Sequence, residues 1–197
     1  MEALEHAREG MEHAAHGAPE GFSRRVALLV GALAASLAIS ELQVQRAQNE
    51  YLTHHITVSD DWTFYGFKET RARLSEQTVT ILNALPGPVD ATRQADIAAA
   101  QAVVKRMRDG DATGPGTKQI AEKATEEEHL RDHALHRYHL YEYAAGALQI
   151  AIVLASASIV ARIGIVAVAG GILGVASIVL VAAVAAGMVY TISPGAP

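Results

Sequence analysis

Three long apolar segments constrain this chain more than any other feature of its sequence. They cover residues 22–42, 143–161 and 163–190, and Arg162 is the only charged residue within or between the last two. A bilayer's hydrocarbon core is about 30 Å thick, so a helix of about 20 apolar residues crosses it. A single run of this kind is typical of a buried core helix. Three in a chain of 197 residues instead favour three membrane-spanning helices, the last two joined in a tight hairpin.

The first apolar segment has a second interpretation, as the hydrophobic region of a signal peptide, because "SRRVALL" faintly resembles a twin-arginine signal. The polar N-terminal segment before it, residues 1–21, carries five glutamates, which suits a signal peptide poorly, and no A-x-A cleavage site follows. We therefore expect an uncleaved membrane anchor.

The arginines beside the spans predict an orientation. Arg24 and Arg25 precede the first span and Arg162 separates the other two, so all three lie on one side if every segment crosses. By the positive-inside rule that side is cytoplasmic. The sequence thus predicts a cytoplasmic N-terminus, with residues 43–142 and the short tail 191–197 outside.

The polar segment, residues 43–142, has the pattern of a helical stalk. Between Leu42 and Leu85 there is one glycine and no proline, so the first span's helix should continue outward. An apolar or aromatic residue recurs there every seven positions, the spacing of a coiled-coil seam. These residues are Val44, Tyr51, Val58, Tyr65, Ala72 and Val79. The stalk is therefore expected to contain a coiled-coil-like packing face.

Proline and glycine divide the rest of the stalk. Pro86 and Pro88 should end the outgoing helix, and Asp90 should cap a second helix over residues 90–107. A breaker loop follows at residues 109–117, and a helix from Lys118 should run into the second span. The outgoing arm of about 42 residues rises about 63 Å and the two returning helices about 66 Å. The predicted fold is an all-α integral membrane protein with three transmembrane helices and an antiparallel stalk between the first and second.

Three stretches carry a family resemblance: "ELQVQRAQNEY", "DDWTFYGFKETR" and "RDHALHRYHLYEYAAGALQIAIVLASASIVAR". In this order they resemble the bacterial membrane proteins catalogued as domain of unknown function 4337. The resemblance covers nearly the whole chain. It implies three membrane helices around a helical middle, in a bacterial cell membrane, with no established activity and no catalytic residues.

Histidines form one candidate site. His129, His133 and His136 share one helical face, and an i, i+4 histidine pair can chelate a divalent metal. His54 and His55 lie at a similar height on the outgoing arm, so a pH-sensing cluster is an alternative. The simpler interpretation, which we favour, is a set of solvated or interhelical polar residues. There is no H-E-x-x-H motif, and although Glu122 and Glu126 share this helical stripe, no carboxylate is obviously dedicated to orienting the histidines.

Two further groups are candidate interfaces. Trp62, Phe64, Tyr65 and Phe67 hold the only tryptophan and two of the three phenylalanines, and they predict either a docking surface or stalk core. Gly170 and Gly174 have the small-xxx-small spacing that lets membrane helices approach closely. Alternatively, these two glycines pack against the second span of the same chain.

Composition excludes several functions. The chain has no cysteine, which excludes disulfides and thiol chemistry, and its net charge of −5 argues against nucleic-acid binding. The spans carry no ionisable residue at mid-depth, unlike proton-coupled transporters, and no nucleotide-binding or catalytic motif occurs.

The sequence therefore predicts a non-enzymatic structural or accessory membrane protein, with no cofactor. We expect its stalk to oligomerise with other copies or to bind a larger membrane complex, since two helices alone bury little. The alternatives are a homo-oligomeric pore or pH-responsive channel, and a metal-binding protein using the histidine face.

Overall fold

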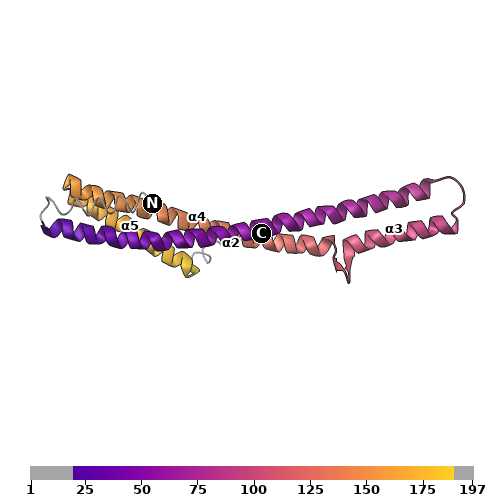
Figure 1. The fold of residues 1–197 in the computed structure, drawn as a ribbon, viewed down its shortest axis with the longest axis horizontal. Helices are drawn as coiled ribbons and strands as arrows, with labels where there is room; N and C mark the ends of the chain where they lie inside the picture. Colours follow the sequence, from indigo (N-terminus) through magenta and orange to yellow (C-terminus); the bar gives the residue numbers. More distant parts are fainter. Residues whose placement is uncertain (1–19, 189–197) are drawn as a thin grey trace. The chain divides into compact units, whose positions relative to one another are not determined.

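The computed structural model describes residues 20–188 and is all-helical apart from one two-residue ladder (Figure 1). Its elements are α2 (Glu20–Ala84), α3 (Ala91–Asp109), β1 (Gly110–Asp111), β2 (Gly114–Pro115), α4 (Thr117–Ala161) and α5 (Gly164–Ala185). Three of these helices, α2, α4 and α5, are long and apolar enough to cross a membrane. The predicted helical class is confirmed, and so is the presence of three helices long and apolar enough to span a membrane. Most of segment 1–21 and all of tail 191–197 lie outside the described residues.

The helix boundaries follow the residues that break or cap helices. α2 is one continuous helix that ends at Ala84, two residues before Pro86. The Asp90 carboxylate accepts a hydrogen bond from the Arg93 backbone N–H at 2.7 Å and so caps α3. The Arg93 guanidinium also donates to the Leu82 and Leu85 carbonyl oxygens, at 2.6 and 2.8 Å. These bonds satisfy carbonyls at the end of α2 that the helix itself leaves unpaired.

The predicted breaker loop contains a small antiparallel hairpin that the sequence analysis did not foresee. Gly110 pairs with Pro115, and Asp111 pairs with Gly114. Gly110 has a φ of +80°, and a Cβ there would lie 2.6 Å from the Gly116 nitrogen. A Cβ on Gly116 would overlap the Arg108 carbonyl oxygen. Both glycines are needed because the two backbones cross at close range.

The chain divides into two compact units, each described here by itself. We call residues Tyr51–Asp132 the middle unit, and residues 20–50 with 133–188 the span unit. The span unit contains α5 and the more apolar parts of α2 and α4. Its core includes Val30 and Leu33 of α2 with Leu148 and Ile152 of α4, each no more than 2% exposed. The unit is therefore a packed three-helix assembly.

The middle unit contains the later part of α2, all of α3 and the start of α4. Side chains of α2 meet later residues in reverse order along the chain: His54 contacts Glu127, Asp61 contacts Lys123, and Glu76 contacts Arg108. The heptad residues Tyr51, Val58, Tyr65, Ala72 and Val79 are all buried or half-buried. The predicted seam therefore faces the inside of this unit.

Candidate functional site

The interior of the middle unit is partly polar. His54, Asp61 and Lys68 lie three residues after the heptad positions Tyr51, Val58 and Tyr65, and each contacts the returning chain. The His54 Nδ1 lies 2.7 Å from the Glu127 Oε2, and the Asp61 Oδ1 lies 3.1 Å from the Lys123 Nζ. The Lys68 Nζ donates to the Pro115 carbonyl oxygen in the hairpin. Specific polar pairs thus fix how these segments align, while the heptad residues between them fill the seam.

A second ionic group joins α2 to α3. The Arg108 guanidinium donates to the two Glu76 carboxylate oxygens at 2.6 and 3.0 Å, and its Nη2 lies 3.6 Å from Glu69. The hydrogen bond from Arg73, together with the charges of Arg108 and Arg73, lowers the pKa of the Glu69 carboxyl below its usual value. Glu69 is therefore a point where acid should loosen the middle unit.

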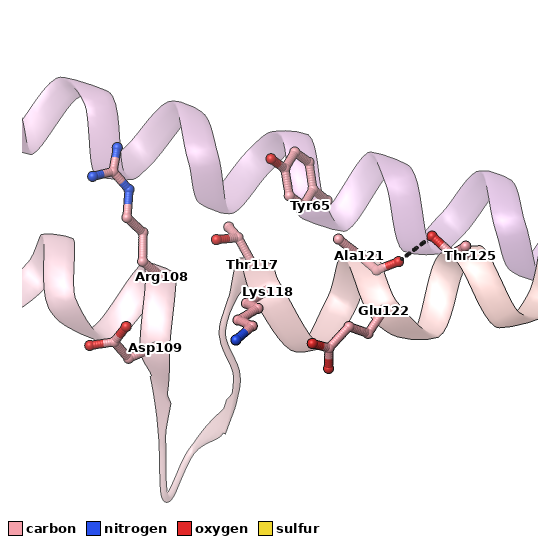
Figure 2. A pocket seen from close by; sticks show the side chains of 8 residues that line it. All are labelled: Tyr65, Arg108, Asp109, Thr117, Lys118, Ala121, Glu122 and Thr125. Atoms are coloured by element: carbon pink, nitrogen blue, oxygen red, sulfur yellow. Dashed lines mark hydrogen bonds between the residues drawn. The ribbon is translucent and has the colours of Figure 1, made fainter.

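An open hollow of about 660 Å³ lies in the middle unit, next to the hairpin. Its lining residues are Tyr65, Arg108, Asp109, Thr117, Lys118, Ala121, Glu122 and Thr125. In Figure 2, Tyr65 projects from α2 toward α4, and Arg108 projects from α3 toward α2, where it meets Glu76. Two basic and two acidic residues balance each other in the lining, which contains no histidine. The hollow therefore has neither the charge of an anion site nor a nucleophile paired with a base.

The predicted metal-binding histidines are not gathered into a site. His129 belongs to the middle unit, His133 and His136 belong to the span unit, and all three are exposed. Among residues 20–188, no three histidine or acidic side chains are arranged to hold a metal ion. The sequence also suggested that His54 could join these histidines in a cluster. In the structure, His54 is instead paired with Glu127.

The predicted aromatic interface divides between two faces of α2. Tyr65 is half-buried on the inner seam, and Trp62 packs edge-on against it, with ring centroids 5.4 Å apart. The Trp62 indole N–H also donates to Glu128 at 3.0 Å. Phe64 and Phe67 are exposed and face away from the seam; the Lys68 ammonium lies 5.0 Å from the Phe64 ring centroid. Phe67 is the most exposed of the four at 63%, and Phe64 and Trp62 are exposed at 44% and 38%.

A second seam on the outer face of α2, which the sequence analysis missed, continues from these phenylalanines. Its positions follow the alternating three- and four-residue spacing of a coiled coil. They are Phe64, Phe67, Arg71, Leu74, Thr78, Ile81 and Leu85, and all seven are exposed. We call this set the outer seam. The sequence of α2 fits both the inner heptad line and the outer seam. Only the structure shows that the inner line is buried or half-buried while the outer seam stays exposed.

The predicted glycine interface lies inside the span unit. A Cβ on Gly170 would lie 2.9 Å from the Ala151 carbonyl oxygen of α4, and a Cβ on Gly174 would overlap the Leu33 side chain of α2. Both glycines are buried. Their close-packing surface is therefore used within the chain, against both other helices, and is not open to a second copy.

A smaller polar groove of about 360 Å³ lies in the span unit where α2 and α4 become polar. Glu41, Gln45, Glu142 and Gln149 line it with three small or apolar residues. Partial removal from water, reinforced by the Glu142 carboxylate, raises the pKa of the neighbouring Tyr138 hydroxyl. Glu41 and Glu142 are exposed, so the groove is open to solvent and does not form an enclosed site.

This architecture defines a class: an all-helical protein with three helices capable of crossing a membrane and a separate helical unit between the first and second. A family model described as Domain of unknown function (DUF4337) matches residues 22–187, and the chain belongs to this family. No curated protein and no solved structure matches the chain.

Proposed function

We propose that this chain is a non-enzymatic membrane protein whose middle unit is an interaction module. The span unit anchors it in a bacterial cell membrane, and the middle unit associates either with other copies or, as an accessory part, with a larger membrane complex. Three helices of membrane-spanning length and apolarity support the anchoring role. The family assignment is compatible with this role and names no activity.

The middle unit is proposed to act as an antiparallel stalk. The reversed order of the His54–Glu127, Asp61–Lys123 and Glu76–Arg108 pairs supports this arrangement. In the orientation predicted by the positive-inside rule, Arg24, Arg25 and Arg162 face the cytoplasm and the stalk lies outside. Such a stalk offers long helical surfaces to a partner and no enclosed cavity for a substrate.

The exposed outer seam supports this interaction role most directly. The outer seam exposes five large apolar side chains, with exposed fractions between 44% and 63%. These side chains belong to the middle unit, whose α2 segment is otherwise rich in charged and hydroxyl residues, so lipid is a poor explanation for them. A contiguous apolar surface of this kind marks a protein interaction site on a soluble or extramembrane unit.

Native mass spectrometry of the full chain, extracted from membranes in mild detergent, tests this function. The expected result is an oligomer or a complex of fixed stoichiometry with another membrane protein. A strict monomer that carries no stoichiometric partner over the whole range of mild detergents would contradict the proposal.

A further inference from the structure

We infer that the outer seam binds the same seam of a second copy of this chain, in parallel and in register. This inference rests on the proposed interaction role of the middle unit and specifies the partner. The starting observation is an imbalance between the two faces of α2. The inner line is buried or half-buried, whereas the outer line leaves five large apolar side chains exposed: Phe64, Phe67, Leu74, Ile81 and Leu85.

The spacing of the outer seam suits a helical partner. Phe64, Arg71, Thr78 and Leu85 take the a positions of a heptad repeat, and Phe67, Leu74 and Ile81 take the d positions. Every d position is therefore a large apolar residue. In a two-stranded coiled coil, a and d side chains insert between four residues of the facing helix, so this pattern fits a second helix better than a flat surface.

The area is sufficient for a specific dimer. Five large apolar residues of about 200 Å² each, about half exposed, remove roughly 500 Å² from water on each copy when covered. Two copies together bury about 1,000 Å², the lower limit for a specific protein interface. Complete coverage of these five side chains therefore reaches the smallest area that a specific dimer needs.

Charge also permits self-association. The positions that flank the seam carry Thr63, Thr70, Gln77 and Ser75, all uncharged, so two copies do not repel each other along most of its length. The one flanking cation, Lys68, is turned toward the Pro115 carbonyl oxygen of its own chain. Arg71 is the single charged a position. The two polar a positions, Arg71 and Thr78, cost some stability in a coiled coil and fix its register, which suits an interface between identical helices.

The parallel direction follows from the membrane. α2 is one unbroken helix from Glu20 to Ala84 and contains the first span and the outer seam as far as Ile81, with Leu85 directly after its end. Two copies inserted in one bilayer with the same orientation have α2 helices that run in the same direction. Identical residues then meet across the pair, as a closed two-fold interface requires.

Disulfide formation between single cysteines tests this inference directly, because the natural chain has none. Thr78 and Thr80 form a matched pair. Both are exposed, both lie in the same turn region of α2, and each hydroxyl donates to the carbonyl oxygen four residues earlier at 3.0 Å. Thr78 occupies the outer seam, whereas Thr80 points about 200° away from it around the helix. Thr78→Cys and Thr80→Cys should therefore be equally tolerated and differ only in what they face.

The full-length variants are oxidised mildly in membranes, and the products are separated without reductant. The expected result is a covalent dimer for Thr78→Cys, at least tenfold more abundant than for Thr80→Cys. Equal cross-linking of both variants, or cross-linking of neither, overturns the inference. An oligomer or a mixed complex seen by native mass spectrometry without the Thr78→Cys dimer leaves the interaction role standing and rejects the parallel self-pairing.

Discussion

Arg108 of α3 and Glu76 of α2 share two hydrogen bonds, of 2.6 and 3.0 Å, that tie the two helices together near the hairpin. Both side chains are more than 40% exposed, so water screens the pair and its contribution is up to about 1 kcal/mol. In Arg108→Met, amide hydrogen exchange of α3 should accelerate by at most about fivefold. Arg106→Met removes the same charge from an exposed position of α3 and should have little effect; equal acceleration in both variants would show that net charge is the cause.

Glu69 gives the middle unit a defined response to acid. Its pKa in the folded chain lies below the usual value of 4.5, so its stabilising contribution is fully present above about pH 4.5. That contribution is lost as the pH falls through the lowered pKa. Thermal unfolding should therefore show Glu69→Gln less stable than the natural chain at pH 7, with the gap narrowing as the pH falls below about 4.5.

The control for this acid response is Glu122→Gln, which neutralises an exposed carboxylate on α4. It should show no comparable gap at pH 7. A constant difference between Glu69→Gln and the natural chain from pH 7 to pH 3 would contradict the assigned ionic role of Glu69.

The two glycines of α5 should respond differently to a methyl group. At Gly170 the obstacle is backbone, the Ala151 carbonyl oxygen at 2.9 Å, whereas at Gly174 it is the end of the Leu33 side chain, which can rotate. Gly170→Ala should cost about 1–3 kcal/mol, as overpacking does, and Gly174→Ala clearly less. Thermal unfolding in detergent measures which of the two variants loses more stability.

Gly31 of α2 provides the reference for these variants, because a Cβ there meets nothing within 4 Å. Gly31→Ala should leave the melting temperature unchanged or raise it slightly, since alanine favours helix. A Gly174→Ala variant as unstable as Gly170→Ala would mean that Leu33 cannot move aside.

Orientation can be measured with an impermeant thiol reagent on intact cells. Gln94→Cys places the only thiol on the exposed surface of α3, and Gly164→Cys places it at the first residue of α5, directly after the turn from α4. The positive-inside rule predicts labelling of Gln94→Cys in intact cells and of Gly164→Cys only after permeabilisation. The reverse pattern would place the middle unit in the cytoplasm.

Local signals in the sequence predicted most of the helix boundaries. Pro86 and Pro88 predicted the end of α2, and Asp90 predicted the start of α3. The β1–β2 hairpin was not predicted, because its two-residue ladder depends on the close backbone crossing at Gly110 and Gly116. Propensity and periodicity contain no information about such a crossing.

The candidate sites were harder to predict, because a shared helical face does not reveal what lies opposite. His129, His133 and His136 were grouped by helical geometry alone, and no acidic or histidine partner completes a metal site among residues 20–188. Gly170 and Gly174 have an interface spacing, but which helix they meet depends on three-helix packing. Phe64 and Phe67 were identified, whereas Leu74, Ile81 and Leu85 were overlooked because the inner heptad line explained the same helix.

The central claim is that α2 joins two copies through the outer seam, and the native mass of seam variants tests it most directly. Leu74→Glu places a charge at an exposed d position, and Thr80→Glu places the same charge off the seam. Neither side chain is buried within its own chain, so both variants should keep the helical content of the natural protein. The natural chain and Thr80→Glu should have the mass of two copies and Leu74→Glu the mass of one. A dimer that survives Leu74→Glu, or one that Thr80→Glu disrupts equally, would contradict the claim.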